Sequence, residues 1–441
     1  SFKKLFLGLF VTGVVNVVYC GWVVFFGDFV GWQNPYGNIL GLFGNPNFIG
    51  AFLGIWISAT IAYFVFSKTA VWVKLAIVAL LLLSFYEVYK SRAVQGVVVS
   101  AAGIVTVLFY WIRGRFKKNS ILAAYTIPVL GFGIVALFGA LQKGPLAEIV
   151  YKTSVSLRGA YWNAGIQTGL ANPFTGAGMD AYGDWFRRSR TEYNATVLPG
   201  PSTVTNSAHN VVIDIFSYGG FPLLFSYMGI LLLGAWAIIK NLRRTREFNP
   251  LFVALSVAWI GYQLQSIISI NQIGLAVWGW VLTGALVAYE SRFSRRLANE
   301  EDAKKPARGR KSSSETFSSP LVAGLGVVAG LILAAPPISG DMAWFRATSS
   351  GNFVEVEKAL KTGYLHPQDT SRLVNVVSIL ENSKLYDQAL QYALRATEFN
   401  PENFDSWSAL YSVQKSTLEQ KSVALANMRR LDPHNPELEK L

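Results

Sequence analysis

Long apolar stretches alternate with short polar segments along most of this chain. A helix needs about 20 apolar residues to cross the hydrocarbon core of a bilayer, because it rises by about 1.5 Å per residue. Stretches of this length therefore predict membrane-spanning helices. We count nine of them, at about 5–26, 48–66, 74–89, 94–112, 121–140, 211–239, 251–268, 274–290 and 319–337.

The loops between these stretches differ in charge. Basic loops alternate with loops that carry little charge, and the positive-inside rule places the basic ones in the cytoplasm. The alternation predicts that the other loops face outward. These are residues 27–47, 90–93, 141–210, 269–273 and the chain after about 338.

The composition supports this picture. The chain has 441 residues, of which 52% are hydrophobic and 15% are charged, whereas a soluble domain carries about 25% charged residues. We predict an all-α, polytopic helical membrane protein.

A net charge of +13 is also found in nucleic-acid-binding proteins. Here the basic residues lie mainly between apolar stretches, where they set membrane orientation, so we expect no nucleic-acid partner. The single cysteine, Cys20, excludes an intrachain disulfide.

The chain divides into six predicted regions. They are N-terminal transmembrane helices at 1–140, an outward polar loop at 141–210, transmembrane helices at 211–290, a basic cytoplasmic linker at 291–318, a last transmembrane helix at 319–340 and an outward helical domain at 341–441. We expect the chemistry in the polar loop, which is rich in glycine and proline and framed by membrane. Because the first residue is Ser1 rather than methionine, we expect further helices before it.

The last region has a repeat-like pattern. A helix with small residues on one face ends at Asn400-Pro401, and a similar ending recurs at Asp432-Pro433, 32 residues later. This spacing is close to the period of about 34 residues of tetratricopeptide repeats. Such arrays bind peptides or partner proteins on a concave face, so we expect a protein partner here. A plain helical cap on the membrane region is an equal alternative.

Two arginines lie at the predicted outer face. Arg92 is at the top of a tight helical hairpin, where snorkelling to the interface would explain it. Arg158 is one helical turn before Trp162, so a cation–π contact would explain it. Ionisable groups in a membrane region are costly, however, and suggest a function. The functional alternative is that these guanidinium groups hold a diphosphate through bidentate hydrogen bonds.

His209 lies where the polar loop re-enters the membrane. A neutral imidazole is the natural general base near pH 7. Asp214 could orient the ring, although residues five apart do not share one face of a helix. The structural alternative is an interface histidine beside a helix capped by Asn206 or Ser207.

Two further segments of the loop contain candidate binding residues. The run 172–178 is rich in turns, and Gly176 and Gly178 permit close backbone approach, as they also do in many structural turns. A basic cluster follows, where solvated charge is the usual explanation and attraction of an anionic lipid or a diphosphate is the alternative. It consists of Arg187, Arg188 and Arg190.

The outward loops contain no cluster of His, Cys and carboxylate residues at the spacing of metal ligands. Loop 27–47 offers only Asp28. We therefore expect a site without a metal or a cofactor. Protease, ATPase and kinase motifs are also missing from the sequence, which makes these classes unattractive.

Five motifs together resemble the bacterial O-antigen ligase and polymerase superfamily, over residues 40–235. They are Phe43-Gly-Asn-Pro-Asn-Phe48, Ser91-Arg92, Arg158 with Tyr161-Trp162, Asn172-Pro-Phe-Thr-Gly-Ala-Gly178, and Ala208-His209-Asn210 followed by Tyr218-Gly-Gly-Phe-Pro222. The chain departs from the family's pattern after Ser91-Arg92, where Ala93-Val-Gln95 replaces the usual small residues.

The resemblance implies an inverting, metal-independent glycosyltransferase at the outer face of the bacterial plasma (inner) membrane. Its donor would be a polyprenyl diphosphate-linked glycan, and its acceptor a hydroxyl of a lipid, a glycan or a protein. Ligase, polymerase and protein O-oligosaccharyltransferase activities share these motifs. The roles implied are diphosphate binding by Arg92 and Arg158, acceptor activation by His209, and supporting substrate contacts by Arg187, Arg188, Arg190, Trp162, Asn210 and Gly178.

Two other functions remain open. A transporter or flippase for lipid-linked sugar would share an outward basic pocket, but it would also need ionisable groups at mid-membrane and internal repeats. Glu87 is the nearest such group, and we expect it to pair with Lys90 or Arg92. A membrane anchor for the terminal domain would leave the polar loop unexplained.

Overall fold

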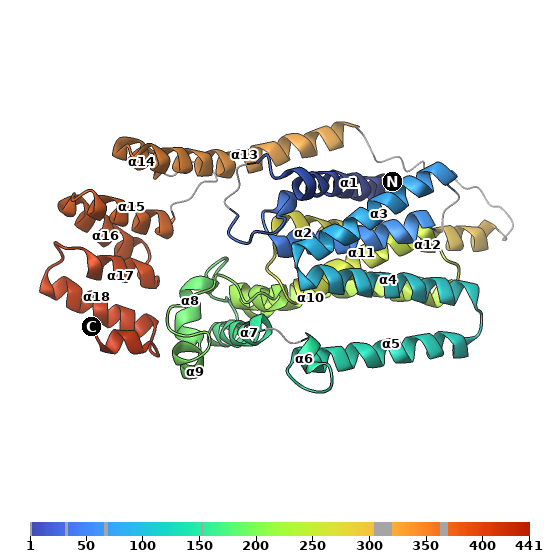
Figure 1. Cartoon of the computed structure of the whole chain (residues 1–441), viewed down its shortest axis with the longest axis horizontal. Coiled ribbons are helices and arrows are strands. Elements are labelled where there is room, and N and C mark those ends of the chain that lie inside the picture. Colours follow the sequence, from blue (N-terminus) through green and yellow to red (C-terminus); the bar gives the residue numbers. More distant parts are fainter. Residues whose placement is uncertain (1, 31–33, 66–68, 151–152, 304–319, 362–368) are drawn as a thin grey trace. The chain divides into compact units, whose positions relative to one another are not determined.

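The computed structural model of this protein describes residues 2–30, 34–65, 69–150, 153–303, 320–361 and 369–441. Every regular element within these ranges is helical (Figure 1). The chain divides into two compact units, each described by itself below. Unit 1 comprises Ser1–Ser189 and Thr205–Lys305, and unit 2 comprises Arg190–Val204 and Pro306–Leu441.

Eight of the described helices are long and apolar enough to cross a membrane. They confirm the prediction of a polytopic, all-α membrane protein. They are α1 (Phe2–Phe26), α2 with the π-helical turn after it (Pro46–Val65), α3 (Val71–Ser91), α4 (Val94–Arg115), α5 (Asn119–Ala140), α10 (Val211–Arg244), the first part of α12 (Ile273–Ala303) and most of α13 (Pro320–Ser350). All but α13 belong to unit 1.

The remaining predicted stretch, 251–268, is also a helix, but a shorter one. α11 (Pro250–Ser266) has 17 residues, and every side chain from Phe252 to Trp259 is buried. It packs against α2, α4 and α12. Its apolar character therefore reflects the interior of the helix bundle. All nine predicted stretches are helices within the described residues; eight of them are long candidate spans, and α11 is a shorter central helix.

α2 lies at the centre of unit 1, between α4 and α11. Nearly all of its side chains are buried. The approach to α4 is so close that a Cβ added at Gly54 would lie 2.8 Å from the carbonyl oxygen of Gly96. Small residues allow such close packing where lipid supplies no hydrophobic driving force between helices.

Basic side chains join the helices of unit 1 at one end of the bundle. Arg113, at the end of α4, donates to the carbonyl oxygens of Leu242 and Thr245 at the end of α10. Near the end of the apolar part of α12, Glu290 pairs with Arg244. The starts of α4 and α10, which carry Arg92 and His209, therefore share the opposite end.

The predicted polar loop is largely helical. It contains α6 (Ala147–Val150), α7 (Thr153–Ala171), α8 (Tyr182–Ser189) and α9 (Glu192–Thr196). α7 packs along the first half of α10 (Figure 1). Two glycines of α7 allow this: a Cβ at Gly165 would lie 2.6 Å from Ile213, and one at Gly169 would lie 2.4 Å from Phe216.

Unit 2 is built from helical hairpins that follow α13 and α14 (Phe353–Ala359). The hairpins pair α15 (Thr370–Asn382) with α16 (Tyr386–Phe399), and α17 (Phe404–Ser412) with α18 (Leu418–Leu431). The predicted face of small residues on α16 is fully buried, at Ala389, Ala393 and Ala396. Large side chains would not fit there, which explains the alanine pattern.

Candidate functional site

His209 lies in the turn that leads into α10. Its backbone has a left-handed conformation, with φ of 53°. The next residue, Asn210, caps the helix, because its side-chain oxygen accepts hydrogen bonds from the amides of Val212 and Ile213 at 3.1 and 3.3 Å. The alternative considered from the sequence placed a cap at Asn206 or Ser207, whereas the structure has it at Asn210. The cap leaves His209 as the last residue before the helix begins.

Asp214 holds the two residues that precede His209 in the turn. Its carboxylate accepts the Ser207 hydroxyl at 2.7 Å and the Ala208 amide at 2.7 Å. The Ser207 hydroxyl in turn accepts the amide of His209 at 2.9 Å. Both carboxylate oxygens are thus used by Ser207 and Ala208. The sequence had instead suggested that Asp214 could orient the imidazole ring.

Two residues of α7 lie close to the imidazole. The ring of Tyr161 has its centroid 5.6 Å from that of His209, with 32° between the ring planes. Burial lowers the pKa of His209 below its ordinary value of 6.5, and the positive charge of Arg158 lowers it further. The imidazole is therefore neutral at pH 7. Burial lowers the pKa of Arg158 too, but an arginine remains charged at neutral pH.

A cavity of about 470 Å³ opens beside His209. It lies between the turn before α10, the turn after Gly178 and the loop that joins α11 to α12. Its polar lining comes from Asp180, Thr205, Asn206, Ser207, His209, Asp214, Tyr218 and Asn271. Unit 1 alone supplies all of these residues.

Left-handed backbone recurs at this site. Asp180, which also lines the cavity, has φ of 58°, and Arg92 at the end of α3 has φ of 54°. Such conformations are costly for residues other than glycine and cluster at functional sites. The described chain has only two others, at Gln142 and Lys384. Of the five left-handed residues other than glycine, Asp180 and His209 line the cavity and Arg92 is a predicted diphosphate ligand.

The glycine-rich run 172–178 pairs with a kink in α10. The amides of Ala177 and Gly178 donate to the carbonyl oxygens of Ser217 and Tyr218, at 2.8 and 3.1 Å. The kink arises at Gly220, whose φ is 61°. The predicted close backbone approach is therefore confirmed, but it is made to α10 of the same chain. Gly178 has φ of 104° and directly precedes Met179 and Asp180, which line the cavity.

The remaining predicted residues have different surroundings. Arg92 is exposed at the C-cap of α3, and it does not line the cavity. Arg188 stacks over the ring of Trp185 at 4.3 Å, and Arg187 is half-buried beside it on α8. Trp162 packs against the buried cluster under the turn, which includes Tyr182, Phe186 and Ala208.

Arg190 is not available to a ligand. Its side chain is fully buried and forms an ion pair of 2.7 Å with Asp432 of α18's C-cap, whose side chain is also fully buried. It further donates to the carbonyl oxygens of Gly200, Pro201 and Thr203. All of these residues belong to unit 2. The predicted supporting role in diphosphate binding does not fit this environment.

Glu87 has no counter-ion of the kind we expected. Its side chain is 0% exposed, and neither carboxylate oxygen has a hydrogen-bond partner within the described chain. Lys90 instead lies over the ring of Tyr86, at 5.4 Å. A buried ionisable group without a partner is costly, so Glu87 is a second position of interest.

Sequence reasoning missed several residues that line the cavity, among them Asp180, Asn271 and Tyr218. Asp180 comes two residues after the glycine-rich run, and this position was a usable signal. Asn271 lies in the short loop 269–273, which was predicted to face outward, and its side chain accepts a hydrogen bond from Tyr262 at 3.0 Å. Tyr218 was quoted only as part of a motif, although its side chain reaches the cavity.

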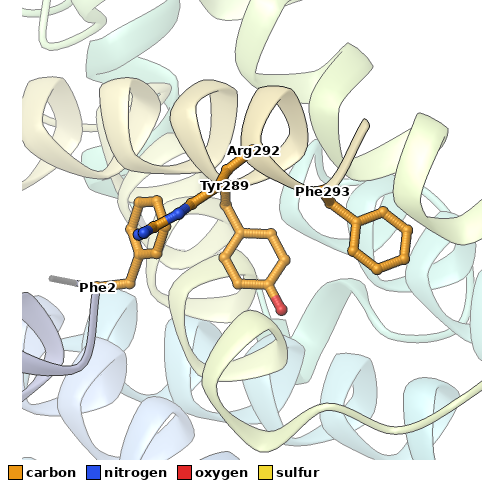
Figure 2. Close-up of a pocket in the computed structure, with 4 residues that line it drawn as sticks. All are labelled: Phe2, Tyr289, Arg292 and Phe293. Carbon is orange, nitrogen blue, oxygen red and sulfur yellow. The ribbon is translucent and has the colours of Figure 1, made fainter. Parts of the chain in front are cut away.

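A second, smaller cavity of about 130 Å³ lies at the basic end of unit 1. Phe2 of α1 and three residues of α12 line it, and Figure 2 shows the ring of Tyr289 between Phe2 and Phe293. The rings of Phe2 and Tyr289 are 5.3 Å apart. This cavity contains none of the predicted site residues, and its aromatic contacts close the bundle at that end.

Within the described ranges, no three His, Cys, Asp or Glu side chains gather closely enough to hold a metal ion. Metal independence stays a prediction, because a substrate can bring its own cation.

Comparison with protein-family models and with curated proteins finds no match to this chain.

Proposed function

We propose that this multi-pass membrane protein is a glycosyltransferase that moves a glycan from a polyprenyl diphosphate carrier to an acceptor hydroxyl. The observation that carries the proposal is the placement of His209, which lines a cavity of about 470 Å³ and lies beside the ring of Tyr161. Its imidazole is half-buried, and the positive charge of Arg158 lowers its pKa. A neutral base under the influence of a fixed cation suits a reaction that removes a proton and releases an anion.

The chemistry follows from these two groups. His209 removes the proton of the acceptor hydroxyl, and the acceptor oxygen attacks the anomeric carbon of the donor. The bond from that carbon to the diphosphate oxygen breaks, and the lipid diphosphate leaves with the electron pair. Arg158 stabilises the charge that builds on the diphosphate oxygens. One displacement inverts the anomeric centre.

Arg92 is the second proposed diphosphate ligand. It lies at the same end of the helix bundle as His209, because α4 and α10 meet at their opposite ends through Arg113. Its side chain is exposed at that end. We propose that a donor whose diphosphate lies at the bilayer surface contacts both arginines. We place this surface at the outer face of a bacterial plasma membrane.

Ligase, polymerase and protein O-oligosaccharyltransferase activities are all compatible with this chemistry. The helical hairpins of unit 2 favour a protein or a large polymer as acceptor, because such hairpins commonly bind macromolecules. Removal of residues 341–441 tests this point. We expect loss of acceptor choice with the donor still consumed, and unchanged acceptor choice would exclude a role for these helices.

The test of the proposal is transfer in liposomes. The full chain is given a polyprenyl diphosphate-linked glycan and a panel of acceptors, with and without a chelator. We expect product from the parent under both conditions and none from His209→Asn or Arg158→Ala. Asparagine tolerates the left-handed backbone at position 209, so the turn is retained. Arg115→Ala, which removes an exposed arginine from the opposite end of α4, serves as the control.

Glu87 supports a second candidate, a transporter of lipid-linked sugar. A buried carboxyl group without a partner in a membrane helix is typical of proton-coupled carriers. The same liposomes distinguish the two functions. Movement of the intact donor across the bilayer, lost in Glu87→Gln and kept in His209→Asn, would favour transport over transfer.

A further inference from the structure

We infer that the smaller cavity, at the basic end of unit 1, binds the headgroup of an anionic phospholipid. The described residues that line it are Phe2 of α1 and Tyr289, Arg292 and Phe293 of α12 (Figure 2). This inference goes beyond the proposed glycosyl transfer and does not depend on it, because none of these residues has a role in that reaction.

The cavity lies at the depth of lipid headgroups. The candidate spans of α1 and α12 are Phe2–Phe26 and Ile273–Ser294. Phe2 is thus the first residue of one span, and Arg292 and Phe293 belong to the last turn of the other. A helix that crosses the hydrocarbon core ends in the polar headgroup region. Side chains of these two helix ends can therefore contact a lipid phosphate.

Arg292 supplies the positive charge of the cavity. Its side chain is exposed, and it has no ion-pair partner within the described residues. The neighbouring carboxylate, Glu290, already pairs with Lys240 at 3.4 Å and with Arg244. In Figure 2 the side chain of Arg292 extends from α12 toward Phe2. Its guanidinium group can therefore hold a phosphate through two parallel hydrogen bonds.

Aromatic rings form the apolar walls of the cavity. The ring of Tyr289 lies 5.3 Å from that of Phe2 and 4.9 Å from that of Phe252 at the start of α11. These contacts fix the tyrosine ring between three helices. Tyrosine is enriched at the membrane surface, because its ring has an apolar body and a polar edge. The walls thus suit the glycerol and the first methylene groups of a lipid beside the arginine.

The size of the cavity favours a headgroup over a whole ligand. It holds about 130 Å³, whereas pockets that enclose a complete ligand hold about 300–1,000 Å³. A phosphate group fits in such a space, and acyl chains do not. Exposed apolar side chains near the same end of α1, Leu7 and Val11, offer a surface for the chains. A lipid can use both features, and a soluble phosphate can use only the first.

Lipid binding by the full chain in detergent tests the inference. Phosphatidylglycerol, which is anionic, and phosphatidylcholine, which is zwitterionic, are titrated separately with identical acyl chains. Native mass spectrometry resolves each lipid that binds. We expect the first phosphatidylglycerol to bind the parent about tenfold more tightly than the first phosphatidylcholine, as one charge-assisted contact allows.

Arg292→Gln is the decisive variant, and Arg115→Gln is its matched control. Both remove one exposed arginine from the basic end of unit 1, but Arg115 does not line the cavity. We expect the preference for phosphatidylglycerol to fall to less than about threefold in Arg292→Gln, because glutamine offers only neutral hydrogen bonds. Arg115→Gln should keep the parental preference. Arg292→Lys, which keeps the charge without the planar fork, should give an intermediate value.

Phe293→Ala tests the aromatic wall separately from the charge. The ring contacts the lipid whatever its headgroup, so its loss should weaken the binding of both lipids by roughly three- to tenfold. The preference for phosphatidylglycerol should remain, because Arg292 is retained. A loss of the preference itself in Phe293→Ala would contradict this division of roles.

The other outcomes decide the site as a whole. Equal affinity of the two lipids in the parent, a preference that survives in Arg292→Gln, or an equal loss in Arg115→Gln would each overturn it. If Arg292→Gln does not fold, a parental preference in Arg292→Lys would overturn it as well. Displacement of phosphatidylglycerol by an equimolar amount of soluble glycerol phosphate would show that a phosphate ester alone suffices, and a lipid would then be the wrong ligand.

Discussion

Arg190 and Asp432 form an ion pair in which both side chains are completely buried, with 2.7 Å between Nη2 and Oδ2. A second guanidinium nitrogen, Nε, also reaches the carboxylate, at 3.3 Å. Asn435 donates to the same carboxylate at 3.0 Å. This pair therefore fastens the segment Arg190–Val204 to the C-terminal helices of unit 2.

Loss of one partner of this pair should destabilise unit 2. We expect Arg190→Ala to lower its free energy of unfolding by about 3–5 kcal/mol, because Asp432 would remain as an uncompensated buried charge. Hydrogen exchange of the α18 amides measures this loss. Lys415→Ala, which breaks the exposed pair with Asp387, should cost less than about 1 kcal/mol. Equal protection of α18 in the two variants would contradict the prediction.

The rate of transfer should depend on the neutral form of His209. Burial and the charge of Arg158 lower its pKa, so its proton is lost at a lower pH than the ordinary 6.5. The apparent pKa of the acid limb, in the profile of kcat/KM against pH, should therefore lie below 6.5. In Arg158→Gln the charge of Arg158 is gone, and the pKa of His209 should rise.

An NMR titration of the His209 ring tests the second half of this prediction even if Arg158→Gln is inactive. The chain has two other histidines, His366 and His434, and substituting each in turn assigns the His209 signal. A pKa of His209 that stays unchanged or falls in Arg158→Gln would show that the two side chains do not interact.

Asp214 should control the position of the base. In Asp214→Asn one acceptor oxygen becomes a donor amide, which cannot accept both the Ser207 hydroxyl and the Ala208 amide. The turn carrying His209 then shifts, and a misplacement of about 1 Å can lower the rate by about 100-fold. We expect kcat to fall and the KM for the donor to change little.

Ser207→Ala provides a graded comparison with Asp214→Asn. It removes the hydroxyl that joins His209 to Asp214 but keeps the bond from the Ala208 amide. Its loss of kcat should be smaller. Parental kcat in Asp214→Asn would show that the turn holds its shape without the carboxylate.

Glycine-to-alanine changes at Gly176 and Gly159 should have opposite effects on the stability of unit 1. Gly176 has φ of 65°, and an added Cβ would lie 2.2 Å from the backbone of Tyr218. Gly176→Ala should therefore destabilise unit 1 by more than about 1 kcal/mol. Gly159 is exposed on α7 with nothing within 4 Å of an added Cβ, so Gly159→Ala should stabilise by about 0.4–1 kcal/mol. Thermal denaturation in nanodiscs compares the two.

The sequence was informative where its signal is local. The long apolar stretches correctly predicted the eight candidate spans, because a bilayer imposes a minimum helix length. The shorter, buried α11 was not distinguished from the long helices, because an apolar run has the same pattern whether it faces lipid or the protein interior. His209 and Arg158 were singled out from short motifs, and the positive charge of Arg158 acts on the His209 imidazole.

The parts that depend on distant segments could not be predicted. Asp180 and Asn271 meet at one cavity although they are far apart in the chain, so no periodic pattern records it. The burial of Arg190 depends on a partner 242 residues away. Read alone, the basic cluster after Trp185 resembled a binding patch. The sequence could not show that its last arginine, Arg190, belongs structurally to the other unit.

The kink of α10 bears on how the protein is made. At Gly219 and Gly220 the helix loses its regular hydrogen bonding, and Pro173 accepts the amide of Phe221 at 2.7 Å while run 172–178 satisfies the freed carbonyl groups. In lipid, unsatisfied backbone groups cost several kcal/mol each. During synthesis this run leaves the ribosome before α10 does. We therefore expect the bent helix to reach its final form as the run docks onto it, so that membrane insertion and folding of the polar loop are coupled.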